Sequence, residues 1–358
     1  MGPPIFLNPG PGQLLIEEMQ LLEFTDKGIY CPVADAYIDP WRPVGKALIT
    51  HGHADHARWG HRHYLCTVQA KPVIRYRLGR QISISTLDYG EAIVMNGVRI
   101  SFHPAGHIIG SAQIRLEYKG EVWVVSGDYK IEDDGLSAPF EPVKCHTFIT
   151  ESTFGLPVFN WQPEEAIAGE LNSWWRQNQE AGRVSVLGAY ALGKAQRLLR
   201  MLDPELGTIY THGAIENTNE VIRAQGVDLP PTVRATQDIP RDRYPGQMVI
   251  APPSALSGGW MRKFPEASTG LASGWMALRG ARRRRAADRG FVLSDHADWE
   301  GLNGAIEATG ATRVFVTHGY THLFARWLQS KGLQAQEAST EFEGELFENA
   351  DPAEEQEL

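Results

Sequence analysis

Short apolar runs that end abruptly in polar or small residues recur along the chain. Runs of four or five apolar residues are too short for most helices and are typical of buried strands. Two longer stretches between the runs, 163–179 and 192–202, have helical periodicity. Alternating strands and helices predict an α/β fold. The expected strands are 47–50, 122–126, 147–150, 183–187, 247–250, 291–294 and 313–317.

Residues that carry chemistry follow several of these expected strands directly. His51 follows the first, Glu151 follows the third, and His318 follows the last. The run at 291–294 leads into Asp295 and His296. In sheets of this class, reactive side chains gather at the carboxyl ends of strands. The pattern therefore predicts one site built from residues that are distant in sequence.

Length and composition describe an ordinary globular chain. Its 358 residues are 42% hydrophobic, which is enough for a full core and suggests about two domains. The three cysteines form no Cys-x-x-Cys pair, which excludes a disulfide framework and fits a reducing compartment. No apolar run reaches membrane-spanning length, and the amino terminus has no signal-peptide pattern. We therefore expect a cytoplasmic location.

The net charge of −9 is concentrated in one segment. Residues 337–358 contain eight Glu, one Asp and no Lys or Arg. The rest of the chain therefore has 34 basic residues against 34 of the 43 acidic ones. We expect a solvated, disordered acidic tail. It argues little against a polyanionic substrate, because the body of the protein is neutral.

A change of composition in the middle of the chain predicts an inserted domain. Residues 156–290 contain two strand–helix units, two Pro-Pro pairs and a cluster of arginines. The expected organisation is a first domain built from 1–155 and 291–336, an insertion at 156–290, and the tail at 337–358.

The strongest chemical signal is His51-Gly-His53-Ala-Asp55-His56, placed directly after a strand. Two histidines at positions i and i+2 of an extended chain point the same way. An aspartate and a histidine in the turn beyond can face a second point a few ångströms away. Four such ligands within six residues are what a pair of divalent metal ions needs.

This spacing resembles the His-x-His-x-Asp-His signature of the metallo-β-lactamase superfamily. His107 in Pro104-Ala-Gly-His and Asp128 in Ser126-Gly-Asp resemble two further ligand motifs of that superfamily. The resemblance implies an αββα sandwich and an aspartate that supports the ligands without binding metal. Asp35 and Asp39 both qualify for that place, and Asp35 in Val33-Ala-Asp-Ala-Tyr is favoured.

Three later motifs resemble those of the β-CASP nucleases, in which an α/β cap domain is inserted into the sandwich. They are Glu151-Ser-Thr-Phe-Gly, Leu293-Ser-Asp-His296-Ala-Asp and Val314-Phe-Val-Thr-His318-Gly. Within that branch the pattern is similar to bacterial ligase-associated DNA exonucleases, which are also labelled mRNA 3′-end processing factors. These bacterial enzymes are relatives of the Artemis-type repair nucleases. One feature departs from this finer match, since animal cross-link repair enzymes generally lack the last histidine, whereas His318 is present as in RNA-processing members.

The resemblance implies roles for individual residues. It assigns His51, His53 and His107 to one metal ion, Asp55, His56 and His318 to a second, and Asp128 as a bridge. Zinc is the first expectation, and the mixed His/Asp set also admits manganese. Glu151 and His296 are implied as a hydrogen-bonded pair at the scissile phosphate, with His296 assisting the leaving oxygen. The expected catalytic residues are Asp55, Asp128, Glu151 and His296.

The inserted segment contains the candidate substrate-binding residues. Six Arg and one Asp lie between Arg279 and Arg289, and such a cluster can neutralise several phosphates. A weaker basic patch lies at 71–80. Hydroxyls and backbone N–H groups at 254–259, and a lysine at the start of a helix, could hold a terminal phosphate. The substrate contacts expected from these features are Ser254, Ser257, Gly258, Lys194, Arg282, Arg283 and Arg284.

These features predict a metal-dependent DNA exonuclease, acting from the 5′ end, in DNA repair beside an ATP-dependent ligase and a helicase. The end preference and the repair role are implied by resemblance alone. An RNA-processing β-CASP ribonuclease is the first alternative, because nothing in the sequence tests for a 2′-hydroxyl. A small-molecule thioester or lactam hydrolase and an inactive nucleic-acid-binding subunit are further alternatives. The inserted segment argues against the small-molecule hydrolase, and the complete set of metal ligands argues against the inactive subunit.

Overall fold

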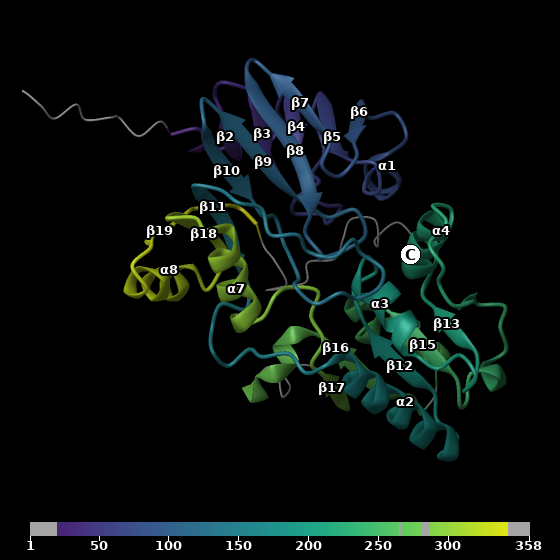
Figure 1. The fold of residues 1–358 in the computed structure, drawn as a ribbon. Coiled ribbons are helices and arrows are strands. Elements are labelled where there is room, and N and C mark those ends of the chain that lie inside the picture. The colour runs from purple at the N-terminus through teal and green to yellow at the C-terminus, as the bar shows by residue number, and fades with distance from the viewer. Residues whose placement is uncertain (1–19, 265, 281–286, 343–358) are drawn as a thin grey trace, which may run out of the picture.

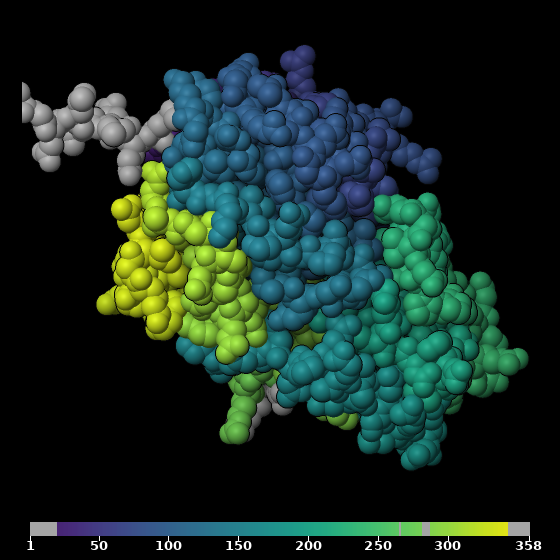
Figure 2. All heavy atoms as spheres, viewed as in Figure 1, coloured from purple at the N-terminus to yellow at the C-terminus, as the bar shows by residue number. Residues whose placement is uncertain are grey.

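The computed structural model describes residues 20–264, 266–280 and 287–342 of the chain. Three sheets organise these residues (Figure 1). Two of them face each other in one lobe, and the third forms a second lobe beside them (Figure 2). Within the described residues, no helix combines the length and the apolar character that a membrane crossing requires.

The first sheet has the order β1-β2-β3-β4-β5-β6. Its strands from β3 onward are parallel, whereas β1, β2 and β3 pair antiparallel. The helix α1 (Lys71–Leu78) connects β5 and β6. The strands are Glu23–Phe24 (β1), Ile29–Cys31 (β2), Ala36–Ile38 (β3), Lys46–Leu48 (β4), His63–Thr67 (β5) and Ile84–Leu87 (β6).

The second sheet has the order β19-β18-β11-β10-β9-β8-β7 and combines strands from two stretches of the chain, 92–152 and 313–337. Strand β11 pairs in parallel with β18, which follows it by more than 150 residues. The strands are Ala92–Met95 (β7), Val98–Pro104 (β8), Ala112–Tyr118 (β9), Glu121–Val125 (β10), Thr147–Ser152 (β11), Arg313–Gly319 (β18) and Gln334–Glu337 (β19).

The third sheet is all parallel and consists of strands between β11 and β18 in the chain, in the order β14-β13-β15-β12-β16-β17. Its strands are Ser185–Gly188 (β12), Ile209–Thr211 (β13), Val233–Arg234 (β14), Met248–Ala251 (β15), Ser268–Ala272 (β16) and Arg289–Phe291 (β17). Its helices are Glu164–Glu180 (α2), Lys194–Met201 (α3), Gly213–Arg223 (α4) and Pro253–Leu256 (α5), with short 3-10 turns at 241–243, 259–263 and 274–277.

Alternation along β10 explains how the lobe with two sheets is layered. Trp123 and Val125 pack in the core between the first and second sheets, whereas Val122 and Val124 pack on the opposite face. Successive strand residues point to opposite faces, so a strand with five apolar or half-buried residues is covered on both sides. The outer cover is formed by α7 (Trp299–Thr309) and α8 (Thr321–Ser330).

Helix α1 covers the other outer face, where Ile74 and Leu78 pack against Tyr64 and Cys66. The layers are therefore helix, sheet, sheet, helix. The predicted α/β class, an αββα sandwich with an inserted α/β domain, is confirmed. Helices α2 and α3 match the two predicted helical stretches to within about two residues.

Two expectations differ from the structure. The expected strand at 291–294 ends at Phe291, and the next residues form an irregular loop in which Asp295 contacts His107. The first residues of the expected tail are packed: Glu337 ends β19, Ala338 is buried, and Phe342 lies against the core of the sandwich. The apolar ring of Phe342 accounts for this, since its burial stabilises the packed state. Residues 343–358 lie outside the described residues.

Candidate metal centre

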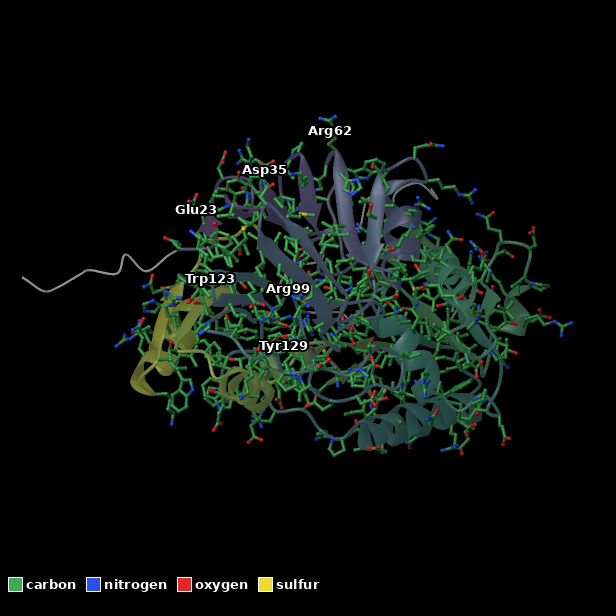
Figure 3. All side chains as sticks on the ribbon, turned by 45° about the horizontal axis from the view of Figure 1, so that its top comes forward. Glu23, Asp35, Arg62, Arg99, Trp123 and Tyr129 are labelled. Atoms are coloured by element: carbon green, nitrogen blue, oxygen red, sulfur yellow. The ribbon has the colours of Figure 1, made fainter. Side chains whose placement is uncertain are left out.

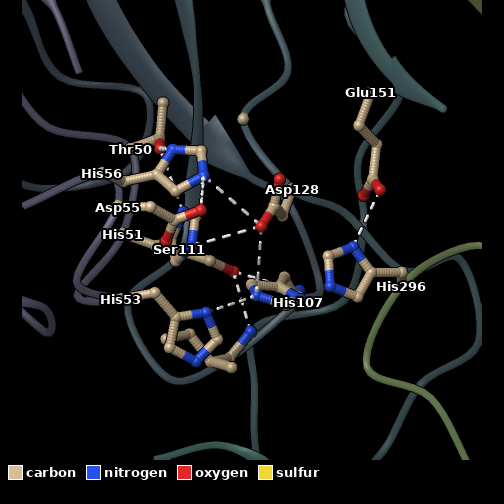
Figure 4. Close-up of polar contacts among 12 residues, drawn as sticks. Thr50, His51, His53, Asp55, His56, His107, Ser111, Asp128, Glu151 and His296 are labelled. Carbon is tan, nitrogen blue, oxygen red and sulfur yellow. Dashed lines mark hydrogen bonds and ion pairs between the residues drawn. The ribbon is translucent and has the colours of Figure 1, made fainter. Parts of the chain in front are cut away.

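Five histidine side chains surround the carboxylate of Asp128 (Figure 4, which labels four of them). Asp128 Oδ1 lies 3.0 Å from the Nε2 of His318. Asp128 Oδ2 lies 3.5 Å from the Nε2 of both His51 and His56, and 3.8 Å from the Nε2 of His107. The fifth histidine, His53, joins the cluster through its Nδ1, which lies 3.0 Å from His107 Nε2. Residues from four separate segments thus meet at one carboxylate.

Each of these histidines has its other ring nitrogen fixed by an oxygen acceptor. His107 Nδ1 lies 2.7 Å from the backbone oxygen of Asp295, and His53 Nε2 lies 3.2 Å from that of Leu192. Carbonyl oxygens only accept hydrogen bonds, so both of these nitrogens carry a hydrogen. The ring nitrogens that face Asp128 and each other, His107 Nε2 and His53 Nδ1, are therefore the unprotonated ones in the neutral rings.

Two threonines complete the same arrangement. The hydroxyl of Thr50 donates to Asp39 at 2.5 Å, which leaves its oxygen to accept from His51 Nδ1 at 3.0 Å. The hydroxyl of Thr317 donates to the backbone oxygen of Thr150 at 3.0 Å and accepts from His318 Nδ1 at 3.2 Å. Fixing one nitrogen by a hydrogen bond presents the other as a metal ligand.

The donor atoms fit a divalent cation. The Nε2 atoms of His51 and His56 are buried and have no hydrogen-bond partner within the described residues, and they point toward Asp128 Oδ2. Unsatisfied buried polar atoms are rare in proteins, and here they converge. The lone pairs of His53 Nδ1 and His107 Nε2 also face each other at 3.0 Å, a contact that a shared cation makes favourable. Imidazole and carboxylate are ligands of zinc and manganese.

The pKa values of the cluster show a division of charge. Burial lowers the pKa of His51 and of His107 well below the ordinary value, which keeps both rings neutral as ligands must be. Burial disfavours the charged form of His56 as well, yet the carboxylates of Asp128, Asp55 and Asp39 outweigh it and raise its pKa well above the ordinary value. The same negative potential that favours a proton there favours a metal cation.

Asp55 lies on the His56 side of the cluster. Its Oδ2 is 3.6 Å from His56 Nε2. Its own burial raises its pKa, but the neighbouring His56 and other histidines prevail and lower it. The seven sequence-predicted ligands are thus brought together, with His53 and His107 on one side of Asp128 and Asp55, His56 and His318 on the other. His51 lies near both His53 and His56.

The structure places Asp39, and not the favoured Asp35, against the ligands. Asp39 is buried, and its Oδ2 accepts from His56 Nδ1 at 2.8 Å while its Oδ1 accepts from Thr50 N at 2.8 Å. Asp35 is exposed at the outer end of the first sheet and pairs with Lys46 at 3.2 Å (Figure 3). The preference for Asp35 is therefore corrected: after β3 the chain turns Asp39 inward toward Thr50.

A glycine allows the end of β10 to approach this group. Gly127 has a φ of +59°, and a Cβ there would lie 2.7 Å from Thr50 Cβ. The backbone thus passes against the threonine that orients His51 and delivers Asp128 directly beside the ring. Any larger residue at 127 would push the carboxylate away from the histidines.

Glu151 and His296 form a buried pair beside the cluster. Glu151 Oε2 lies 2.8 Å from His296 Nδ1, and its Oε1 accepts from Tyr129 N at 2.8 Å (Figure 4). Thr153 also donates to Glu151 at 2.5 Å. The His296 ring lies 4.7 Å from that of His107 between centroids. Burial lowers the pKa of His296, but the carboxylates of Glu151 and Asp128 outweigh this effect and raise it.

Four of the predicted substrate-binding residues, Ser254, Ser257, Gly258 and Lys194, lie within the described residues. Ser254, Ser257 and Gly258 lie exposed in and after α5, at the carboxyl end of β15. Lys194 is fully buried and pairs with Asp295 at 3.7 Å. The pairing follows from burial, since a buried ammonium requires a counter-charge. Arg282, Arg283 and Arg284 lie outside the described residues.

Sequence reasoning missed the groups that orient the ligands. Thr50 and Thr317 each precede a ligand histidine directly, and that shared Thr-His pattern was a detectable signal. The backbone oxygens of Leu192 and Asp295 leave no trace in the sequence, because any residue supplies a carbonyl. Phe342, whose ring stacks on His56 at 4.5 Å between centroids, was hidden within the acidic tail.

Comparison with known proteins adds sequence relationships to this geometry. A "Probable DNA ligase" from Opitutus terrae is 30% identical over 311 residues, which are 86% of this chain and 30% of that protein. "Endoribonuclease ysh-1" from Neurospora crassa is 35% identical over 133 residues, 35% of this chain and 15% of that protein. "Endoribonuclease YSH1" from Mycosarcoma maydis is 26% identical over 257 residues, 56% of this chain and 29% of that protein. The chain therefore spans at most 30% of the length of these three curated relatives.

A solved structure and the family comparison complete the picture. A protein of unknown function from Enterococcus faecalis V583 superposes with a TM-score of 0.52 at 11% identity, covering 76% of this chain and 74% of that one, and this likeness concerns the fold alone. No family model matches the chain. The sandwich with its inserted sheet, the His/Asp cluster and the sequence relationships together support placing the chain, at the level of the family, with the β-CASP metallo-β-lactamase nucleases.

Proposed function

We propose that this protein is a metal-dependent nuclease that hydrolyses phosphodiester bonds in DNA, as an exonuclease acting from the 5′ end. The observation that carries the proposal is the convergence of five histidines and two aspartates next to a buried Glu–His pair. The proposed ligands divide into His51, His53 and His107 for one ion and Asp55, His56 and His318 for a second, with Asp128 shared between them. We propose zinc or manganese as the metal.

Two divalent ions in such a site supply a water of lowered pKa and neutralise the charge of the phosphate oxygens. The chain's own groups have complementary tasks. The carboxylates of Asp128 and Asp55 supply negative charge at the proposed metal site and so attract the divalent ions. His296, fixed through Nδ1 by Glu151, presents Nε2 as a proton donor to the leaving oxygen. Its raised pKa keeps that proton available near neutral pH.

The relationship that spans 86% of the chain supports DNA as the substrate, because that relative is called a probable DNA ligase. The same relationship supports a functional association with an ATP-dependent ligase. We extend this association to a helicase, as part of the proposed role in DNA repair. The proposed cap is residues 156–290, between the two parts of the sandwich. Its Leu192 oxygen contacts His53, so the cap borders the site.

An RNA-cleaving enzyme is the second candidate. The relatives called endoribonucleases favour it, and they include the two from Neurospora crassa and Mycosarcoma maydis. His318, in the last motif, is 3.0 Å from Asp128 and so completes the ligand set expected of RNA-processing members. The two candidates share one site and differ in the sugar of the strand that they accept.

Matched DNA and RNA oligonucleotides, labelled at the 5′ or the 3′ end, test both candidates with zinc, manganese or a chelator. We expect stepwise release of nucleotides from the 5′ end of DNA. His53→Ala and Asp128→Ala are expected to abolish cleavage, whereas His322→Ala, which alters an exposed histidine on α8, leaves it intact. Preferential cleavage of RNA would favour the second candidate. Cleavage that survives both alanine variants would overturn the assignment of the site.

A further inference from the structure

We infer that the inserted segment at 192–197 holds half of the metal centre in place, with Lys194 and Arg197 as its positioning residues. This inference rests on the proposed metal site. It concerns the start of α3, which belongs to the third sheet and yet contacts groups of the sandwich. The contacts that follow fall on the side of His53 and His107.

The first contact is direct. The backbone oxygen of Leu192 accepts from His53 Nε2 at 3.2 Å, so a residue of the insertion fixes the ring of a ligand in the sandwich. Leu192 is itself held by packing, because its buried side chain lies in an apolar cluster with Val73 of α1 and Ile222 of α4. Metal affinity depends on such orienting groups nearly as much as on the ligands.

The second contact runs through the loop that follows β17. The backbone oxygen of Asp295 accepts from His107 Nδ1 at 2.7 Å. The carboxylate of the same residue lies 3.7 Å from Lys194 Nζ and 3.5 Å from Arg197 Nη1. Arg197 also donates from Nη1 to the backbone oxygen of Ser294 at 2.5 Å. The loop is therefore held at Ser294 and at Asp295, directly before the peptide that orients His107.

The network is buried and anchored within the insertion. The side chains of Lys194, Arg197 and Asp295 are 0%, 7% and 6% exposed, so solvent screens these charges little. Arg197 Nε donates to Glu164 Oε2 at 2.7 Å, which ties the network to the start of α2. Two buried cations are thus committed to one loop of the sandwich.

The consequence is specific to one side of the centre. His56 and His318 are oriented by Asp39 and Thr317, which lie in the sandwich. Disturbing α3 is therefore expected to weaken the ion held by His53 and His107 and to spare the ion held by His56 and His318. A purely structural role for the network would lower the stability of the protein without separating the two sides.

Metal titration of Arg197→Lys and Lys194→Met, by calorimetry and by competition with a chromophoric chelator, tests the inference. We expect one of two equivalents to bind about 10- to 100-fold more weakly while the second is unchanged. Arg200→Gln is the matched control, since Arg200 lies on α3 and also reaches the sandwich, by donating to the Gly135 oxygen at 2.7 Å. The melting temperature of the metal-free variants reports any general loss of stability.

The outcomes separate this inference from the proposed function. A wild-type protein that binds no divalent metal would contradict the proposed function itself. A wild-type protein that binds two equivalents, with Arg197→Lys and Lys194→Met binding both as tightly, would overturn only the role of the insertion. Because Arg197→Lys retains the positive charge, it remains informative if Lys194→Met fails to fold.

We further propose, from a separate observation, that α1 and Trp59 form a surface for a single nucleic-acid strand leading to the metal centre. Residues 56–87 contain six Lys or Arg and no Asp or Glu. Trp59 is 62% exposed and Tyr76 is 39% exposed. Exposed aromatics beside a run of cations fit single strands, in which bases stack and phosphates need counter-charges.

This surface adjoins the proposed metal ligands. Arg77 of α1 donates to the Gly52 backbone oxygen, between His51 and His53, at 2.8 Å. Trp59 follows the same ligand motif. Its ring lies at the carboxyl end of α1, because a Cβ on Gly79, the residue directly after the helix, would be 3.4 Å from that ring. Three cations of this helix region form no ion pair with a carboxylate of the described residues, and they are Lys71, Arg75 and Arg80.

Binding of a labelled single strand, measured by anisotropy in the presence of a chelator, tests this surface without requiring cleavage. The double variant Arg75→Ala, Arg80→Ala is expected to reduce the slope of log affinity against log salt by about 1.4, or about 0.7 for each lost phosphate contact. Trp59→Ala is expected to weaken binding about tenfold with an unchanged slope. Arg326→Ala, at an exposed site on α8, is the control. Variants that bind like the control would refute the surface even if cleavage is confirmed.

Discussion

Replacing Asp39 with asparagine tests the carboxylate that orients the His56 ring and, through Thr50, the His51 ring. Asp39 accepts from Thr50 N at 2.8 Å, from Thr50 Oγ1 at 2.5 Å and from His56 Nδ1 at 2.8 Å. Asparagine has the same shape but one acceptor oxygen in place of two, so the three donors can no longer all be satisfied. The His56 ring then loses its fixed orientation, and through Thr50 the His51 ring is loosened as well.

Loss of such an orienting carboxylate weakens metal binding by about 10- to 100-fold, or about 1.4 to 2.7 kcal/mol. Competition with a chromophoric chelator measures this directly. Asp35→Asn is the matched control, because Asp35 also has a positive φ (50°, against 41° for Asp39) but is exposed and away from the ligands. Equal metal affinity of Asp39→Asn and wild type, or a weakening confined to Asp35→Asn, would refute the assignment of Asp39.

Three further predictions concern the proton donor, the backbone and the metal. Glu151→Gln removes the carboxylate that contacts His296 and raises its pKa against burial, so the loss of cleavage on the alkaline side is expected at lower pH than in wild type; identical pH profiles would exclude His296 as the donor. Gly319 has a φ of +95°, and a Cβ there would lie 2.2 Å from Ser152 O, so Gly319→Ala is expected to lower the free energy of unfolding in urea by at least about 2 kcal/mol. Gly332 has a φ of +88° but open space around it, so Gly332→Ala is expected to lower the same free energy by about 1 kcal/mol. Removing divalent metal with a chelator is expected to lower the melting temperature, since binding to the folded state alone stabilises it, and His53→Ala should remove most of that difference.

The sequence alone determined the fold class and the chemistry of the ligands. The short apolar runs predicted the strands because buried strands need apolar residues on both faces, and the local spacing from His51 to His56 predicted metal binding because four ligands lie within six residues. His107, Asp128 and His318 were predicted through motifs, and the pairing of β11 with β18 places His318 beside them.

Tertiary structure alone decided how those ligands are held. The choice of Asp39 over Asp35 depended on which way the chain turns after β3, since both residues carry the same carboxylate. The carbonyls of Leu192 and Asp295 had no sequence signal, because every residue has one and only packing selects which of them meets a histidine. The burial of Lys194 likewise followed from the contact between the inserted segment and the sandwich, which no local pattern of residues records.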